Sequence, residues 1–364
     1  MKKFNLSDDA TRKKLAPFAS VLLGFLVGFI ALFLLGYNPV EGYSYLFHGG
    51  FRGMASGDLR QFGNVLVNMT PLILTGLSIA FAFKTGLFNI GVSGQMLVGG
   101  FCGVYIGAIL ELPRIIHLPL MVTASILGGA IWAFVPGILK AKFKINEVVT
   151  GIMMNYIAFW MVQYAVGRWI PGRFVTESAS IRDTASLRSE WMSNFFNQSA
   201  VNLGLVLAVL ACILVWFVLE KTTFGFELKA VGSNQDAAHY AGMKVQRKIL
   251  LAILISGGLA GLAGAAHYGG FANQLLLGGL PSQGFDGIAV ALLGLNTPLG
   301  VFLSAFLLGF MNVGGLHMQA MAHIPSELVD IIISTIIYFA AISLLIQDFF
   351  KFVASKKRKN GGVK

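Results

Sequence analysis

The feature that most constrains this chain is a series of apolar runs, each close to the length that crosses a bilayer as a helix and each followed by a short polar stretch. Only 12% of the 364 residues are charged and 56% are hydrophobic, which excludes an ordinary soluble domain. We therefore predict an all-α polytopic membrane protein with about ten transmembrane segments, some of them broken or re-entrant. The runs lie at 17–35, 64–83, 88–110, 118–139, 148–166, 201–219, 249–268, 283–295, 299–316 and 328–346.

The distribution of Lys and Arg residues predicts the orientation of these segments. With ten crossings, 20 of the 27 basic residues fall on one side of the membrane. Because positive charge is retained on the cytoplasmic side, the N- and C-termini are both predicted to be cytoplasmic. The net charge of +11 then follows from topology and gives no indication of a nucleic-acid partner.

The same distribution divides the chain into regions. We predict a cytoplasmic N-terminal segment at 1–16 and a transmembrane domain at 17–350. Within that domain, 168–200 is predicted to be an external loop and 220–248 a cytoplasmic loop. Residues 351–364 form a basic tail, which is expected to be attracted to anionic membrane lipid.

The first departure from a plain spanning helix is the sequence FKTGLFNIGVSGQMLVGG at 83–100. Its glycines allow either close approach of two helices or a local unwinding. Unwound backbone at membrane depth must be buried in protein or line a wet cavity. Asn89, Ser93 and Gln95 accompany the glycines, so this membrane segment also carries polar side chains.

The second departure is LLLGGLPSQGFDGIAVALLG at 275–294. Its apolar part, 283–295, rises only 1.5 Å per residue and cannot cross a core of about 30 Å, so we predict a re-entrant or discontinuous element. Short segments interrupted by Gly or Pro are typical of substrate paths in transporters. Asp286 is either an acid favoured by the helix dipole or a member of such a path.

The third departure is the cytoplasmic loop between the sixth and seventh runs, which contains NQDAAHYAGM at 234–243. Asn234 is a good N-cap, and Gly242 is a good stop, so we predict a short helix. This helix is either a solvated connector or a docking element for a soluble partner. In the second case the small residues allow close approach, and Tyr240 and Met243 serve as anchors.

Motifs for catalysis, nucleotide binding and metal binding are absent from the sequence. There is no G-x-x-x-x-G-K-[ST] loop, no nucleophile elbow and no H-E-x-x-H pattern. The six histidines are scattered without metal-ligand spacing, and Cys102 and Cys212 lie inside apolar runs. We predict a protein that is not an enzyme, with no catalytic residue and no metal site.

Four sequences in order along the chain carry a resemblance to a known family: TGLFNIGVSGQMLVGG, NEVVTGIMMNYIA, GFELKAVGSNQDAAHYAGM and GFDGIAVALLG. They resemble the membrane permeases of ABC importers of the branched-chain-amino-acid and simple-sugar group, and most of all the larger permease subunit of bacterial nucleoside importers. The likeness extends from about residue 17 to residue 350. It implies a multi-pass permease that moves nucleosides inward by alternating access across the cytoplasmic membrane of a bacterium.

The resemblance also implies partners. These are a second homologous permease, a cytoplasmic ABC ATPase and an extracytoplasmic solute-binding protein or lipoprotein. The solute-binding protein is expected to dock chiefly on 38–62 and 168–200, although 168–200 could equally be a lid. ATP is then hydrolysed by the partner, and this chain binds no cofactor. The helix at 234–243 matches the coupling helix that docks on the ATPase, formed here by Asn234, Asp236, Ala237, Ala238, Tyr240, Ala241, Gly242 and Met243.

A path for nucleosides needs amides and hydroxyls for the sugar and base edges, and aromatic walls for the ring. We predict that this path is lined by Asn68, Phe88, Asn89, Ser93, Gln95, Asn155, Tyr156, Phe285 and Asp286. At two points the sequence departs from the family pattern. Ser93 stands where a Glu is common, and His267 and Tyr268 stand where an acidic residue often follows LAGLAG, so the choice of solute is left open.

Two alternatives to a nucleoside importer remain at this point. An ABC permease for ribose-like sugars or branched-chain amino acids would share the fold and differ only in its solute. A stand-alone secondary transporter would need ionisable residues deep in the bundle, whereas Asp286, Glu327 and Asp330 all lie near segment ends. The sequence also leaves open whether the two permeases are alike or different and whether 283–295 fully crosses.

Overall fold

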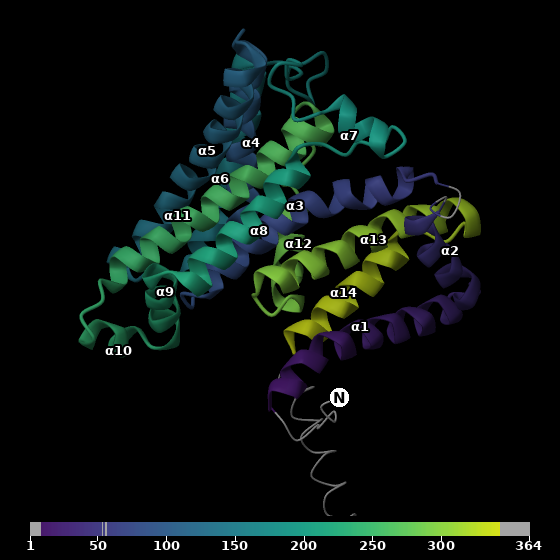
Figure 1. Cartoon of the computed structure of the whole chain (residues 1–364), viewed down its shortest axis with the longest axis horizontal. Coiled ribbons are helices and arrows are strands. Elements are labelled where there is room, and N and C mark those ends of the chain that lie inside the picture. Colours follow the sequence, from purple (N-terminus) through teal and green to yellow (C-terminus); the bar gives the residue numbers. More distant parts are fainter. Residues whose placement is uncertain (1–8, 53, 55–56, 343–364) are drawn as a thin grey trace, which may run out of the picture. The chain divides into compact units, whose positions relative to one another are not determined.

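The computed structural model describes residues 9–52, 54 and 57–342, and these residues form helices and connections without a β-strand (Figure 1). The elements are α1 (Asp9–Leu34), α2 (Pro39–Phe51), α3 (Arg60–Phe83), α4 (Val92–Ile109), α5 (Arg114–Phe143), α6 (Glu147–Trp169), α7 (Glu190–Phe195), α8 (Gly204–Lys221), α9 (Thr223–Ser233), α10 (Gln235–Tyr240), α11 (Val245–Gly264), the π-helix η2 (Ala265–Ala272), α12 (Gln283–Leu293), α13 (Pro298–Ala322) and α14 (Glu327–Ala341). Residues 1–8 of the N-terminal segment and the basic tail at 351–364 lie outside the described residues.

All ten apolar runs coincide with helices, the last of them as far as it is described. Eight helices in the described part are long and apolar enough to cross a membrane: α1, α3, α4, α5, α6, α8, α11 continued by η2, and α13. The prediction of an all-α polytopic membrane protein is therefore confirmed. The number of crossings and the sides of the termini stay predictions, since α12 has 11 residues and α14 has 15 described residues.

The chain divides into two compact units, which are described one at a time. The smaller unit comprises residues up to Gly50 and from Met311 onward. In it α1 packs on α14, where the hydrogen of Gly24 faces Ile336 and that of Gly28 faces Ile332. A side chain at either glycine would force these helices apart, so the two glycines set the close α1–α14 packing.

The larger unit, Phe51–Phe310, has a core built from α4, α5 and α11. These helices meet through glycines: a Cβ on Gly99 of α4 would lie against Gly261 of α11, and one on Gly129 of α5 would lie against Gly257 of α11. The glycines therefore let the backbones touch. Close packing of this kind drives helix association in a membrane, where lipid is as apolar as the side chains and the hydrophobic effect contributes little. This confirms the first of the two roles predicted for the glycines of 83–100.

The end of α11 widens into η2, and a connecting segment binds it. We call residues 170–188 the strap. The backbone N–H of Leu187 donates to the carbonyl of Gly269 at 3.0 Å, and that of Ile181 donates to Asn273 at 2.9 Å. The Arg188 guanidinium donates to the carbonyls of Gly270 and Phe271. The loop predicted at 168–200 is therefore tied to a helix end over much of its length.

Three helices outside the apolar runs were not predicted: α2, α7 and α9. The signals for two of them are present in the sequence. Asn38 accepts from Val40 N just before Pro39, and Thr222 accepts from Gly225 N, so each helix starts at a favourable cap. The region predicted as the loop 38–62 therefore contains the helix α2, and the loop 220–248 contains two helices in place of one.

Candidate functional site

The short helix predicted at 234–243 is present as α10, and local interactions at both ends explain its bounds. The side chain of Asn234 accepts from Ala237 N at 2.9 Å, as an N-cap does. At the other end Gly242 has φ +83°, a conformation that favours glycine, and Met243 N donates to the carbonyl of Ala238 at 3.0 Å. We call α9 and α10 together the coupling module.

The two faces of α10 differ. Tyr240 is 91% exposed, and Asp236, Ala237 and Ala241 are exposed with it. Ala238 is only 4% exposed because it packs in the hydrophobic core of this chain. Of the residues expected to meet an ATPase, Ala238 thus faces inward, and its small size lets α10 approach its own neighbours. Asn234 is exposed but uses its side chain as the cap, and Met243 is half-buried beside the same core.

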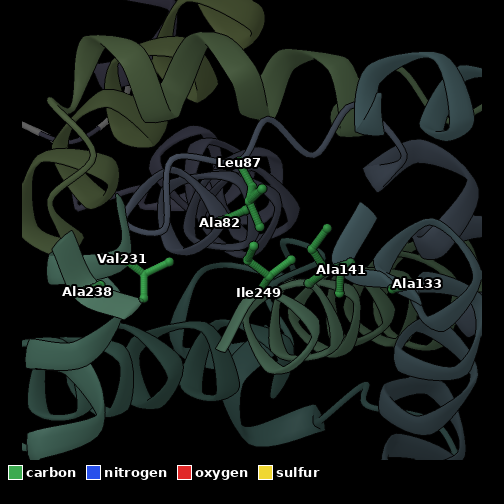
Figure 2. Packing of buried hydrophobic residues seen from close by; sticks show 8 residues of the cluster. Ala82, Leu87, Ala133, Ala141, Val231, Ala238 and Ile249 are labelled. Atoms are coloured by element: carbon green, nitrogen blue, oxygen red, sulfur yellow. The ribbon is translucent and has the colours of Figure 1, made fainter. Parts of the chain in front are cut away.

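Figure 2 shows the core that receives Ala238. It joins Val231 of α9 to Ile249 of α11, and it includes Leu87, which lies between α3 and α4. Ala82 of α3, Ala133 and Ala141 of α5, and Ile253 of α11 complete it. The core therefore joins the coupling module to three membrane helices and to the connection that contains Leu87.

That connection, residues 84–91, is the break predicted in the first glycine-rich sequence, and we call it the link. Helix α4 begins at Val92, four residues later than the apolar run, so the link is not helical. Gly86 has φ +71°, and a Cβ on it would lie 3.3 Å from the carbonyl oxygen of Gly232 in α9. The link and the coupling module are thus in backbone contact.

Charged residues surround this contact. Lys229 donates to Glu220 at 2.6 Å, and Lys248 of α11 forms an ion pair with Glu227 of α9. Burial lowers the pKa of Lys84, the first residue of the link. The positive charge of Lys229 lowers this pKa further, while Glu220 opposes both effects.

The other end of the link is fixed by a buried network of polar side chains. Asn89 donates to Gln95 Oε1 and to Ser256 Oγ, both at 2.8 Å, and its Oδ1 accepts from Gly91 N and from Gln95 Nε2. Ser256 of α11 in turn donates to the carbonyl of Ser78 in α3 at 2.7 Å. The network therefore connects α3, the link, α4 and α11, and its polar atoms satisfy one another.

Two further contacts extend this arrangement to α6 and to the segment before α12. Asn155 of α6 accepts from Gly94 N and donates to the carbonyl of Ile90, both at 2.9 Å. Ser93 donates to the carbonyl of Pro281 at 3.1 Å. Four of the residues predicted to line the solute path, Asn89, Ser93, Gln95 and Asn155, are thus gathered in one place, where each is 5% exposed or less and already hydrogen-bonded.

The remaining residues predicted for the path differ in their surroundings. Tyr156 is 59% exposed, because it follows Asn155 on a helix and points to another face of α6. Asn68 is exposed and donates to the carbonyl of Asn64 on its own helix. Phe88 contacts the ring of Phe83, Phe285 is exposed, and Asp286 lies half-buried in the first turn of α12.

Sequence reasoning missed Ser78 and Ser256, which complete the network. A serine inside an apolar helix is a weak signal, and nothing in the sequence pairs two positions 178 residues apart. Within the described residues, no group of three or more His, Cys, Asp or Glu side chains is placed to hold a metal ion.

Comparison with known proteins places the chain in a family. Residues 61–341 match the family model described as branched-chain amino acid transport system / permease component. The chain belongs to this family. No solved structure matches it.

Curated relatives match over nearly the full length. The guanosine ABC transporter permease protein NupP of Bacillus subtilis is 44% identical over 95% of this chain and 97% of its own length. The nucleoside ABC transporter permease protein NupB of Lactococcus lactis is 38% identical, over 93% and 94%. The glucose ABC transporter permease protein TsgB13 of Haloferax volcanii is 34% identical, over 92% and 88%. This chain is thus a multi-pass membrane permease of the ABC transporter class.

The first two organisms each have a second permease of the same name series that also matches. NupQ of Bacillus subtilis and NupC of Lactococcus lactis are each 28% identical, over 67% and 72% of this chain. Relatives of this chain therefore come in pairs, which supports a second permease as its partner.

Proposed function

We propose that this chain is the permease subunit of an ATP-driven importer for nucleosides in the cytoplasmic membrane of a bacterium. The observation that carries the proposal is the full-length likeness to two permeases named for guanosine and for nucleosides. Its partners are a second, homologous permease, a cytoplasmic ABC ATPase and an extracytoplasmic solute-binding protein or lipoprotein. ATP is used by the ATPase, and this chain binds no cofactor.

The geometry supports a route by which the ATPase could drive the membrane helices. The exposed face of α10, with Tyr240 at its centre, docks on the ATPase, and the buried face with Ala238 transmits the motion inward. The backbone contact between Gly232 and the link carries that motion onward. Because Asn89 and Asn155 bind the link to α11 and α6, a shift of the link moves several spanning helices together.

This route changes the role proposed for the buried polar side chains. Asn89, Gln95 and Asn155 hold helices in register in the described conformation, and a nucleoside could reach them only if alternating access opens the network. Tyr156 and Phe285, which are exposed, remain candidates to stack on the base. The solute path then has aromatic groups accessible in one state and polar groups uncovered in another.

The test of this route uses cells that express the full transporter with variants of α9. Replacing Gly232 by Val places a side chain against the carbonyl of Lys84, whereas Ser233→Val changes an exposed neighbour. We expect Gly232→Val to lower uptake of radiolabelled guanosine at least tenfold at equal amounts of membrane protein, and Ser233→Val to leave it within twofold. Normal uptake by Gly232→Val would reject the route through the link.

The solute is tested separately, by uptake of guanosine, adenosine, uridine, ribose, glucose and leucine with and without this chain. Loss of nucleoside uptake alone supports the proposal. The glucose-named relative favours a sugar as the second candidate, and loss of ribose or glucose uptake with nucleoside uptake unchanged would establish it. That outcome would leave the route through the link standing.

A further inference from the structure

An apolar groove runs along the outside of the larger unit, away from the coupling module and the polar network. It is a cavity of about 530 Å³ between α5 and α8, with α11 as its floor. Ile126 and Ala130 form one wall, Leu210 and Leu214 form the other, and Gly258 lies in the floor. Because Gly258 has no side chain, the groove extends down to the backbone of α11 at this position.

A second cavity of about 330 Å³ continues the first toward the beginning of α5. It shares Val122 and Leu207 with the first cavity and ends at Leu118 and Leu203. From Leu118 to Ala130 the α5 helix rises about 18 Å. Because that is more than half the thickness of a hydrocarbon core of about 30 Å, the combined groove matches one leaflet.

The surroundings of the groove restrict what can fill it. α5, α8 and α11 are all long and apolar enough to span a membrane. Water in the groove would find few polar partners, and an empty groove would lose dispersion contacts along its whole length. A hydrocarbon chain from the surrounding bilayer meets neither penalty.

The end of the groove near Leu118 is positively charged. Arg114 lies one turn before Leu118 on α5, and Arg188 follows Leu187, which lines the second cavity. Arg114 donates to the carbonyl of Arg188 at 2.9 Å, which brings the two residues together. Both arginines are exposed, and no carboxylate pairs with either in the described part of the chain. Guanidinium groups bind phosphate through charge-assisted hydrogen bonds. Nε and Nη2 of Arg188 already donate to Gly270 and Phe271, and Nη2 of Arg114 donates to Arg188, so a phosphate would bind Nη1 of Arg188 and the other nitrogens of Arg114.

We propose that a membrane phospholipid binds here, with one acyl chain in the groove between α5 and α8 and its phosphate at Arg114 and Arg188. The lipid fills the gap between two helices that flank α11, the helix that follows the coupling module. This site belongs to the leaflet on the side of the strap.

The acyl chain is tested in native membranes that contain the full chain and photoactivatable phosphatidylglycerol with a diazirine in mid-chain. We expect labelling of Ile126, Leu210 and their neighbours, mapped by mass spectrometry. Ala130→Phe fills the groove and should lower this labelling at least fivefold. Ile131→Phe is the matched control, since Ile131 is the next residue on α5 and is exposed outside the groove. Leu210→Trp fills the groove from α8 if Ala130→Phe fails to reach the membrane.

The phosphate is tested by comparing that probe with a photoactivatable diacylglycerol, which lacks the phosphate. Arg114→Gln should lower labelling of the groove by the phospholipid at least threefold and leave labelling by diacylglycerol within twofold. Arg114→Lys keeps the charge and should recover part of the effect. Equal loss for both probes would reject the phosphate contact.

Three results would overturn the proposal as a whole. The first is labelling spread evenly over α5 and α8 and equal in Ala130→Phe and Ile131→Phe. The second is a cross-link from Leu210→Cys to another polypeptide in the assembled transporter, which would mean that a partner subunit occupies the groove. The third is increased labelling after deletion of residues 343–364, which would give the groove to this chain's own C-terminal segment.

Discussion

The link and the strap are both non-helical segments that hold the ends of membrane helices, but they do so with different groups. The link is held by side chains, since Asn89 and Asn155 make its key hydrogen bonds. The strap is held by its backbone as well as by side chains, through backbone bonds such as those from Ile181 N and Leu187 N. Side-chain bonds depend on residue identity and backbone bonds do not, so Ile181 and Leu187 of the strap should tolerate substitution better than Asn89 of the link.

The largest expected effect is at the centre of the link. Asn89→Ala leaves the side-chain amide of Gln95 and the N–H of Gly91 without their partner, and both groups are buried. We expect the free energy of unfolding to fall by about 2–3 kcal/mol, measured by thermal unfolding in mild detergent. Asn68→Ala removes an exposed amide and should change it by less than about 0.5 kcal/mol. Equal losses of stability in the two variants would contradict the difference expected between a buried amide and an exposed one.

The next effect concerns Arg188, a side chain that ties the strap to η2 through two hydrogen bonds. Arg188→Gln removes charge-assisted hydrogen bonds to Gly270 and Phe271, and we expect a loss of about 1–2 kcal/mol. Hydrogen exchange at Leu187, whose N–H donates to Gly269, should become faster. Arg173→Gln, an exposed change on the same strap, is the control. Unchanged exchange in Arg188→Gln would mean that the bonds of Arg188 do not hold the strap on η2.

A smaller effect is expected at the N-cap of α10. This cap is a single hydrogen bond between one side chain and one backbone N–H. Asn234→Ala should destabilise this helix by about 1 kcal/mol. Asn234→Asp keeps an acceptor and should restore most of that loss. Hydrogen exchange at Ala237 reports the result. If the Asp variant exchanges as fast as the Ala variant, the cap does not hold α10.

The smallest effect concerns the charge of Lys84 at the start of the link. Because burial and Lys229 lower the pKa of Lys84 in the folded chain, the unfolded chain binds this proton more tightly. The resulting destabilisation is present at neutral pH and is relieved as the pH rises from the folded pKa to the usual value of 10.5. Glu220→Gln should lower the pKa of Lys84 further, and Lys229→Met should raise it.

These shifts in Lys84 are measured by the pH midpoint of its labelling with an amine reagent, read by mass spectrometry. The wild-type midpoint should lie below that of a lysine in the unfolded chain. A midpoint that moves in the same direction for Glu220→Gln and Lys229→Met would contradict the electrostatic explanation.

The contrast between side-chain and backbone bonding also explains what could be predicted from the sequence. The apolar runs, the short α12 and the capped α10 depend on residue type and were predicted, and the break before α4 was one of two alternatives predicted for its glycines. The widening of η2 and much of its binding by the strap depend on backbone groups that every residue carries, so 168–200 was predicted only as an external loop, for docking or as a lid. Asn89 and Gln95 of the buried network stand out in an apolar sequence and were predicted as lining of a solute path, whereas Ser256 is recognisable only when the fold brings it to Ser78.

The glycine contacts of α11 have a consequence for the order of assembly during synthesis. Helices α4 and α5 present Gly99 and Gly129 to a partner that begins at Val245, roughly one hundred residues after α5 ends. At 5–20 residues per second the ribosome needs about 5–20 s to supply it. Until then lipid must cover the two glycine surfaces, and Gln95 waits without the serine that completes its network. The membrane domain can therefore complete its packing only late in translation. A nascent chain stalled before α11 would expose the glycine surfaces of α4 and α5 to the bilayer.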